Sequence, residues 1–325
     1  MTPGGDAPSS ERSPKLFPFR NWGDGLFFAL VASVAFVLLG LFLLLVLILV
    51  QGSWITIEQF GIGFLFSNRW APGQNPTFGA VPFIEGTLVT SAIAMLLAIP
   101  VSLGIAIYLS EQSPSWLRTP LGTLVELLAA IPSVVYGFWG IFVLVPIMRY
   151  SVEPTLKAWF PGNPLFAGPA SGSDVLTASV VLAIMVIPTI SALSRDALAA
   201  VPQSQREAAL SLGATRWETT RMAVLKYARS GVVGAIILGL GRAVGETMAV
   251  TMTIGNADKS FTSLIAQGQS MASLIANEFG GADYAEYRAA VLEIALILLA
   301  ITVLINVVAR VLIWRLVRKT GEVTA

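Results

Sequence analysis

The sequence predicts an all-α integral membrane protein with six membrane-spanning helices. Hydrophobic residues make up 55% of its 325 positions, and charged residues only 12%. Soluble globular proteins carry about 25% charged residues, so this composition favours a protein that crosses the membrane several times. Six apolar runs of about 20–25 residues follow one another along the chain, and each is long enough to cross a hydrocarbon core of about 30 Å.

The composition also excludes several kinds of chemistry. The chain contains no cysteine and no histidine, which removes disulfide bonds, thiol chemistry, zinc sites and histidine general bases. It has no G-x-x-x-x-G-K-[ST] loop that could hold the phosphates of a nucleotide. We therefore expect no catalytic residues, no metal site and no cofactor bound by this chain, with membrane lipid rather than nucleic acid around it.

The predicted elements begin with a disordered tail over residues 1–24, which are rich in Pro, Gly, Ser and charge. The first apolar run has no charge before Glu58, is too long for a signal peptide and lacks a cleavage site, so we expect it to remain as the first span. A membrane domain covers residues 25–319, and residues 320–325 form a second tail. The six spans are predicted near 26–50, 86–110, 121–148, 175–194, 231–255 and 290–314.

The distribution of Lys and Arg predicts the orientation of these spans. With the N-terminus inside, fourteen of the 20 Lys and Arg residues fall in inner segments and five in outer segments, while Arg242 lies within a span. Because inner loops of membrane proteins carry the excess of positive charge, both termini are predicted to be cytoplasmic.

Four prolines fall inside the predicted spans, at Pro100, Pro132, Pro146 and Pro188. A proline removes a helical hydrogen bond, and neighbouring helices can satisfy the freed carbonyl, so these positions predict kinks around a pathway or within structural spans. In an outer loop, residues 263–279 have a weakly helical pattern that predicts a short interfacial or re-entrant segment.

The fifth predicted span contains Arg242 and Glu246 in a glycine-rich apolar run. An ionised side chain at the centre of a bilayer costs about 2.5–3.5 kcal/mol, so both residues need a partner, water or a ligand. On a continuous helix, residues four apart lie on one face about 6 Å apart along the axis. Arg242 and Glu246 then form either a structural ion pair or a functional site. Because the desolvation cost of a buried ion pair can exceed its Coulombic gain, such a pair is a poor device for stability, and we favour a functional site. Gly241 and Gly245 predict a close helix–helix contact.

The longest inner loop, residues 195–230, is called the elbow. It contains two capping-box patterns with Gly213 between them: Ser204 with Glu207, and Thr215 with Glu218. These patterns predict two short helices that break at the glycine, and the small residues around the break allow another backbone to approach closely.

Glu207, Ala208, Ala209 and Gly213 form E-A-A-x-x-x-G, which resembles the coupling motif of ABC importer permeases. In that family the loop docks into a cleft of a cytoplasmic ATPase, so the resemblance implies that ATP hydrolysis on another subunit is transmitted here. The motif of the family usually ends in Leu-Pro, whereas this chain has Leu225–Lys226. The missing proline predicts a less kinked path into span five, or a kink elsewhere.

Three further stretches indicate which family of ABC importer permeases the chain resembles. They are FGAVPFIEGTL at 78–88, ELLAAIPSVVYGFWG at 126–140 and GLGRAVGETMAV at 239–250. Together with the elbow, they resemble the PstC family of permeases from the bacterial phosphate importer over nearly the whole chain after residue 25. The resemblance implies the six-helix, MetI-like fold of importer permeases and a place in the bacterial inner membrane. It also implies a heterodimer with a PstA-like permease, a dimer of PstB-like ATPases that binds ATP and Mg, and a PstS-like phosphate-binding protein.

We expect the substrate pathway to include Arg242, Glu246, Thr247 and Ser133. Arg242 would contact phosphate or lower its barrier, since a guanidinium matches phosphate oxygens in a bidentate fork. Glu246 would hold Arg242 when the path is empty, or accept a hydrogen bond from a protonated phosphate oxygen. Tyr136, in the same span as Ser133, would line the path or satisfy a local backbone group.

Two more carboxylates lie near the ends of spans. Glu126, close to the inner end of span three, is expected to pair with an inner arginine. Glu293, near the outer end of span six, is expected to face water or the membrane interface.

Other functions compete with a phosphate permease. A permease for sulfate, molybdate or phosphonate would share the fold, and the PstA sister subunit is favoured less by the stretches at 126–140 and 239–250. An ion-coupled secondary transporter could use Arg242 and Glu246 as a proton relay, but it would have no ATPase for the elbow to dock. A membrane-embedded enzyme would need a catalytic cluster that this sequence does not offer.

Overall fold

The structure is a computed structural model that describes residues 22–73 and 75–321. Its contacts divide the chain into two units, Met1–Ile48 and Leu49–Ala325, which are described separately. Of the first unit, the described part is the beginning of one long helix. The predicted tail at 1–24 lies outside the described residues as far as residue 21, and that helix begins at Trp22.

Within the described ranges, every regular element is a helix, and paired β residues are limited to two isolated bridges. The α-helices are α1 (Trp22–Phe60), α2 (Gly63–Phe66), α3 (Val81–Ile107), α4 (Ser115–Ala129), α5 (Ser133–Trp139), α6 (Val145–Ile147), α7 (Glu153–Trp159), α8 (Val175–Ala199), α9 (Gln203–Ser211), α10 (Arg216–Thr219), α11 (Leu225–Val244), α12 (Met248–Thr253), α13 (Met271–Glu278) and α14 (Ala285–Gly321). Short π-helical turns are η1 (Tyr108–Gln112), η2 (Gly140–Leu144), η3 (Met148–Val152) and η5 (Thr220–Val224), and 3₁₀ turns are η4 (Pro164–Phe166) and η6 (Phe279–Gly281).

Six helical stretches of the described chain are long and apolar enough to cross a membrane, which confirms the all-α class with six spans. They are Gly23–Phe60, Val81–Gln112, Ser133–Trp159, Val175–Ala199, Arg216–Val244 and Ala285–Val311. The first, second, fourth and sixth overlap the predicted spans closely, whereas the third and fifth differ in a way that affects the site.

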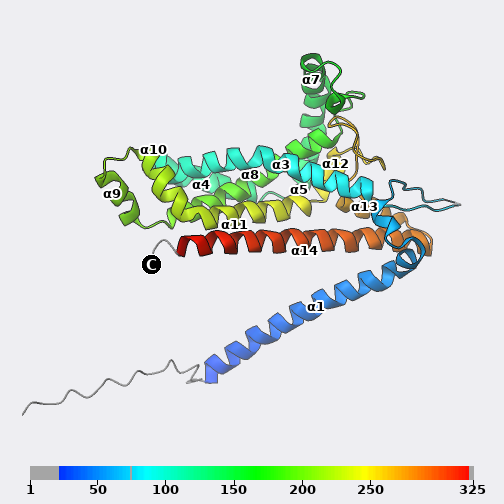
Figure 1. Cartoon of the computed structure of the whole chain (residues 1–325), viewed down its shortest axis with the longest axis horizontal. Helices are drawn as coiled ribbons and strands as arrows, with labels where there is room; N and C mark the ends of the chain where they lie inside the picture. The colour runs from blue at the N-terminus through cyan, green and yellow to red at the C-terminus, as the bar shows by residue number, and fades with distance from the viewer. Residues whose placement is uncertain (1–21, 74, 322–325) are drawn as a thin grey trace, which may run out of the picture. The chain divides into compact units, whose positions relative to one another are not determined.

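Helix α8 is the centre of the packed core in the second unit. It packs against α3, α4 and α11, and these helices run alongside one another with α9 and α10 at one end of the group (Figure 1). Gly239 of α11 allows this approach, since a Cβ there would lie 2.5 Å from Cγ1 of Ile190. A Cβ at Gly241 would lie 4.0 Å from Oδ1 of Asn306 on α14, in ordinary contact, and a Cβ at Gly245 would meet only the carbonyl of Gly241. The closest approach of another helix to α11 is therefore at Gly239 rather than at the G-x-x-x-G pair.

The third predicted span, 121–148, is interrupted in the structure. Helix α4 ends at Ala129, and a new helix begins at Ser133 after Pro132, whose ψ of 139° is extended. A proline disfavours the helical conformation at the residue before it, and at Pro132 the helix breaks at Ile131, whereas Pro100 and Pro188 lie inside continuous helices. From Ser133 the chain stays helical to Trp159, through π-helical turns on either side of Pro146.

The fifth predicted span, 231–255, is also interrupted. Helix α11 ends at Val244, and α12 begins at Met248. Glycines favour helix ends because they lose more backbone entropy in a helix than other residues, and Gly245 follows the last residue of α11. Helix α12 packs on α5, where a Cβ at Gly137 would lie 3.3 Å from the Cα of Ala249. The two interrupted spans therefore meet just beyond their breaks.

The elbow contains two short helices, α9 and α10, with a break between them as predicted. Gly213 lies in the break with a φ of +83°, a conformation that favours glycine. Thr215 and Glu218 form the expected capping box at the start of α10. The box expected for Ser204 is wrong, because α9 begins at Gln203 after Pro202 and Ser204 is already inside its first turn. The path from α10 into α11 contains the π-helical turn η5, which ends directly before Leu225–Lys226, the position at which the family motif has its proline.

The structure also bears on two expectations about the opposite ends of the spans. In residues 263–279, the short helix expected there is α13, whose first four residues are buried against the protein, which disfavours the interfacial alternative and leaves the re-entrant one a prediction. Glu293 is 6% exposed and does not face water, because α14 begins at Ala285 and carries Glu293 two turns into the packed helix. Its neighbour Leu292 packs against Gly52 of α1.

Candidate functional site

Arg242 lies two residues before the end of α11, partly buried beside α8. Its Nη1 donates a hydrogen bond to Oγ1 of Thr189, at 3.1 Å. The adjacent Ala243 and Tyr136 of α5 belong to one buried hydrophobic cluster, which brings this end of α11 close to the broken third span. Within the described residues this guanidinium makes one hydrogen bond, to Thr189, whereas an arginine has five N–H donors. The site can therefore donate several hydrogen bonds to an anion.

Glu246 does not pair with Arg242 in this structure. It lies in the break after α11, and its Oε1 accepts a hydrogen bond from the backbone N–H of Ala249 at 3.2 Å. No ion pair between the two side chains occurs in the described part of the chain. The expected shared helical face is wrong because the helix ends at Val244, between the two residues. Glu246 instead satisfies an N–H at the start of α12, where a carboxylate is favourable.

Thr247 and Ser133 occupy equivalent places in the two interrupted spans. Thr247 directly precedes α12, and its Oγ1 lies 3.4 Å from the carbonyl of Gly245. Ser133 is the first residue of α5, at a helix start where no side chain caps the N–H groups. Helices α5 and α12 pack together, so the breaks that precede them lie at the start of two helices in contact.

Tyr136 closes the break in the third span. Its hydroxyl donates a hydrogen bond to the carbonyl of Leu128 in the last turn of α4, at 2.9 Å, and the residue is 8% exposed. This bond fixes the relative position of α4 and α5 at the break, so Tyr136 satisfies a backbone group, one of its two expected roles. Thr189 is a site residue that the sequence analysis missed. Its position directly after Pro188 in a span was the available signal, because a proline there exposes polar backbone groups.

The coupling motif lies on the outer surface of the elbow. Glu207, Ala208 and Gly213 are exposed and Ala209 is partly buried, and no residue of α9 is fully buried. Leu212 is 89% exposed beside them. An apolar side chain this open next to a row of small residues is typical of a surface that another protein covers.

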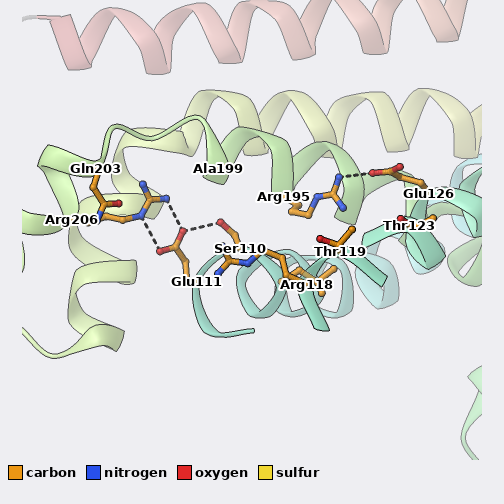
Figure 2. Close-up of a pocket in the computed structure, with 11 residues that line it drawn as sticks. Ser110, Glu111, Arg118, Thr119, Thr123, Glu126, Arg195, Ala199, Gln203 and Arg206 are labelled. Carbon is orange, nitrogen blue, oxygen red and sulfur yellow. Dashed lines mark hydrogen bonds and ion pairs between the residues drawn. The ribbon is translucent and has the colours of Figure 1, made fainter. Parts of the chain in front are cut away.

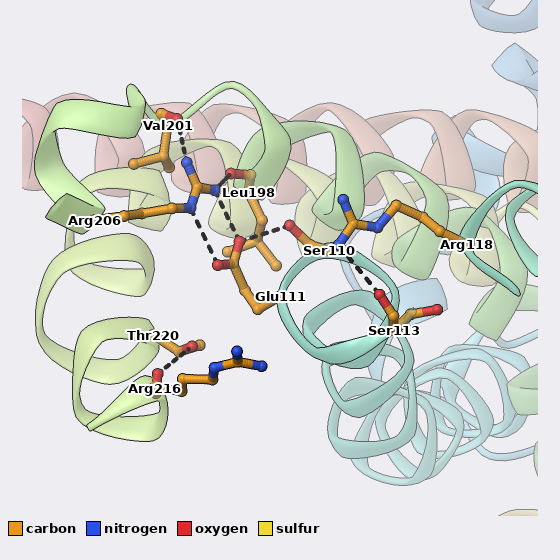
Figure 3. A network of polar contacts seen from close by, with 9 residues as sticks. All are labelled: Ser110, Glu111, Ser113, Arg118, Leu198, Val201, Arg206, Arg216 and Thr220. Atoms are coloured by element: carbon orange, nitrogen blue, oxygen red, sulfur yellow. Dashed lines mark hydrogen bonds and ion pairs between the residues drawn. The ribbon is translucent and has the colours of Figure 1, made fainter. Parts of the chain in front are cut away.

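Arg206, next to the coupling motif, points the other way. Its Nε and Nη2 donate to the two carboxylate oxygens of Glu111 at 3.1 and 2.8 Å (Figure 3). Its Nη2 also donates to the carbonyl of Leu198 at 3.0 Å, and its Nη1 to that of Val201 at 2.5 Å. The hydrogen bonds from Arg206 to Glu111 raise the pKa of the guanidinium above its ordinary value.

A second ion pair lies across a cavity from the first. Arg195 of α8 donates from Nη2 to Oε1 of Glu126 on α4 at 2.6 Å, which confirms that Glu126 pairs with an arginine of the elbow. Gly122 makes room for it, since a Cβ there would collide with the Arg195 guanidinium. The cavity of about 620 Å³ between the two pairs is lined mainly by polar side chains, with Arg118 between the pairs (Figure 2).

Comparisons with known proteins agree with this geometry. Residues 98–318 match the family described as the binding-protein-dependent transport system inner membrane component. The chain is 48% identical over 278 residues to the phosphate transport system permease protein PstC of Pasteurella multocida, covering 84% of this chain and 86% of that protein. It is 47% identical over 297 residues to PstC of Xylella fastidiosa strain Temecula1, covering 90% and 91%. A chain of the MetNI methionine ABC transporter in an inward-facing conformation shares the fold, with a TM-score of 0.54 and 18% identity over 71% of this chain and 93% of that one.

The chain therefore belongs to the inner membrane components of binding-protein-dependent transport systems. Within that family it is a member of the PstC permeases. It is thus a multi-pass membrane protein and a permease subunit of an ABC transporter, with the MetI-like fold that the elbow and the spans predicted.

Proposed function

We propose that this chain is the PstC-type subunit that carries inorganic phosphate across the membrane, powered by ATP hydrolysis on a separate subunit. The observation that carries the proposal is the partly buried Arg242 guanidinium beside two interrupted spans, with a single side-chain hydrogen bond to Thr189. The relatives at 48% and 47% identity are named as phosphate transport permeases, which supports phosphate as the anion.

Arg242 can replace the hydrogen bonds that water makes to phosphate outside the membrane. A doubly or singly charged anion loses its hydration in a narrow path, and a guanidinium replaces that hydration with two parallel, charge-assisted hydrogen bonds. The N–H groups at the start of the helix from Ser133, which no side chain caps, add partial positive charge at the break of the third span. Anion passage needs binding that is strong enough to admit the ion and weak enough to release it, which one arginine and weak dipoles provide.

Glu246 and Thr247 shape the other wall of this path. Because Glu246 caps α12, it holds that short helix against α5 and keeps the carboxylate away from the guanidinium of Arg242. A cap in this position leaves Arg242 available to the anion when the path is empty. Glu246 then acts on phosphate through the position of α12, in place of the direct pairing that the sequence suggested.

The elbow is the part of the chain that we expect to bind the ATPase subunit. We infer that Glu207, Ala208, Ala209 and Gly213 form the docking surface for a PstB-like ATPase, which holds ATP and Mg on its own residues. The exposed small residues and Leu212 support this role. The excess of Lys and Arg on the elbow side supports a cytoplasmic location for the elbow and both termini in a bacterial inner membrane. A PstA-like permease and a PstS-like binding protein complete the proposed importer.

The test is uptake of radiolabelled phosphate by vesicles that contain this chain with candidate PstA-, PstB- and PstS-like partners. We expect uptake to require the ATPase subunit, to continue when an uncoupler removes the proton gradient, and to be competed by arsenate but not by sulfate. Competition by sulfate, molybdate or a phosphonate in place of arsenate would assign another anion. Uptake without the ATPase that an uncoupler abolishes would identify a secondary transporter and contradict the proposal.

A further inference from the structure

Helix α9 carries the coupling motif, yet little of it is packed into the protein. None of its nine residues is fully buried, and it contacts mainly η5 and α10 within the elbow. Its one strongly inward-directed charged side chain is Arg206, 17% exposed, whereas the adjacent Glu207 is exposed. Arg206 is therefore the charged side chain of α9 that reaches into the packed protein, in addition to the contacts of α9 with η5 and α10.

Arg206 connects α9 to two spans at once. Glu111, its partner, lies in the π-helical turn η1 at the end of α3, and the Glu111 side chain is 10% exposed. The carbonyls of Leu198 and Val201 belong to the last turn of α8 and the residues that follow it. Ser110 donates a further hydrogen bond to Oε1 of Glu111 at 2.8 Å, which fixes the orientation of the carboxylate. A two-point arginine–carboxylate contact with low exposure resists sliding and rotation more than a single hydrogen bond does.

The same two spans lead to Arg242. Helices α3 and α8 are packed along much of their length, and Ser102 of α3 donates a hydrogen bond to the carbonyl of Ile187 on α8 at 3.2 Å. Two residues further along α8 is Thr189, the hydrogen-bond partner of Arg242. A displacement that Arg206 transmits to α8 therefore reaches the side chain that holds the anion-site arginine.

We propose that Arg206 and Glu111 are positioning residues that transmit displacement of α9 to α3 and α8, and so couple the docked ATPase to the Arg242 site. This inference rests on the proposed function. It competes with a second route, since the elbow also continues along the backbone through η5 into α11, which carries Arg242 itself. Spatial proximity alone does not choose between these routes, so the choice needs a coupling measurement.

The experiment uses the assembled importer in vesicles and measures how far phosphate-loaded binding protein stimulates ATP hydrolysis. In Arg206→Gln and Glu111→Gln, we expect the ATPase subunit to remain bound and basal hydrolysis to stay near the wild-type rate. Stimulation and uptake should both fall by about tenfold, within the usual range of coupling energies. The matched control is Arg195→Gln, which removes the other arginine–glutamate pair of the same cavity but none that holds α9, and should keep wild-type stimulation.

Three results would overturn the proposal. Wild-type stimulation in both variants would show that the backbone route through η5 suffices. Loss of the ATPase from the purified complex would assign the pair to docking instead. An equal loss of stimulation in Arg195→Gln would show a general effect of the cavity. Failure of the proposed function is distinguishable, because the wild-type complex would then take up no phosphate.

If these variants assemble poorly, a covalent cross-link in place of the Arg206–Glu111 ion pair provides a second test. The chain contains no cysteine, so Glu111→Cys with Arg206→Cys introduces the only two thiols of this subunit. A short bis-maleimide that joins them should restore stimulation to at least half of the wild-type value, while capping each thiol separately with a monofunctional maleimide should not. Recovery with the monofunctional reagent, or no recovery with the cross-link, would contradict a transmitting role.

Discussion

The elbow and the fifth span each contain an arginine with a glutamate that could pair with it, and within the described residues only the arginine of the elbow forms that pair. Arg206 and Glu111 are 95 positions apart in sequence and share two hydrogen bonds. Arg242 and Glu246 are four residues apart, a spacing that brings side chains together on a continuous helix. Arg242 nevertheless donates a hydrogen bond to Thr189, and Glu246 caps α12. Sequence spacing of four residues makes a pair only while the helix continues, and here the helix ends between the two.

The difference also separates two tasks. A closed pair with little exposure fixes two elements to each other, as between α9 and α3. A guanidinium whose carboxylate neighbour is engaged elsewhere keeps donors for a ligand, as at Arg242. Burying an arginine–glutamate pair at the anion site would have cancelled the charge that attracts phosphate. Under the proposed function, the interruption of the fifth span therefore keeps the Arg242 guanidinium available to phosphate.

The largest expected effect is at Arg242. Arg242→Gln removes the charge while keeping a donor, and we expect phosphate uptake to fall by about 100-fold, since hydrogen bonds to charged groups are worth about 1.5–3 kcal/mol each. Uptake is measured with radiolabelled phosphate in vesicles, with the co-purified ATPase subunit as the control for assembly. Arg149→Gln, an exposed arginine at the far end of the third span, should leave uptake unchanged. Near wild-type uptake in Arg242→Gln would remove this residue from the pathway.

Glu246 should show a smaller effect that depends on the replacement. Glu246→Ala removes the acceptor for the N–H of Ala249, and losing a helix cap costs about 1 kcal/mol, so we expect uptake to fall by about fivefold. Glu246→Gln keeps an acceptor oxygen and should retain more uptake than Glu246→Ala. If both replacements abolished uptake as fully as Arg242→Gln, the two residues would act as a charge pair after all.

Much of the fold could be predicted from hydropathy, whereas the local site geometry could not. Six apolar runs give six spans, and Gly213 with the Thr215–Glu218 pattern gives the two helices of the elbow. These features depend on residues close in sequence or on the sum over a whole span. The coupling motif was equally local, and so was recognisable.

The breaks at Pro132 and Gly245 were missed because proline and glycine are both tolerated in membrane helices, where neighbours satisfy the freed backbone groups. Whether such a residue kinks or ends a helix depends on the partner that packs beyond it, here α5 against α12. The contacts from Arg206 to Glu111 and from Arg242 to Thr189 join residues 95 and 53 positions apart. Glu293 was placed at an interface because the start of α14 was set too late.

The contact between the two interrupted spans can be tested by adding a methyl group at a glycine that lies in it. A Cβ at Gly140 would lie 2.7 Å from Cγ2 of Thr253 and 3.1 Å from Cγ2 of Val181, so Gly140→Ala should destabilise the protein by about 1–3 kcal/mol. Gly234→Ala is the matched control, because its Cβ would have no neighbour within 4 Å. Thermal unfolding in detergent measures both. Equal stability of the two variants would contradict the close packing of η2, which directly follows α5, on α12 and α8.

The smallest expected effect is at the break of the elbow. Gly213 has a φ of +83°, and a Cβ in this conformation costs about 1–2 kcal/mol, so Gly213→Ala should weaken association with the ATPase by several fold. Space is not limiting, since a Cβ there meets no atom within 4 Å. Gly213→Asn should be milder, because asparagine tolerates this conformation. Equal affinities for all three proteins, measured by titrating the ATPase subunit, would show that the backbone at this position is not part of the docking surface.

The separation of the two tasks is tested most directly by one measurement, the stimulation of ATP hydrolysis by phosphate-loaded binding protein in Arg242→Gln and Arg206→Gln vesicles. Both variants should lose phosphate uptake. Arg242→Gln should keep the stimulation, because α9 is still connected to α3 and α8, whereas Arg206→Gln should lose it. The same response in both variants, with stimulation kept in both or lost in both, would contradict the assignment of Arg242 to anion passage and Arg206 to transmission.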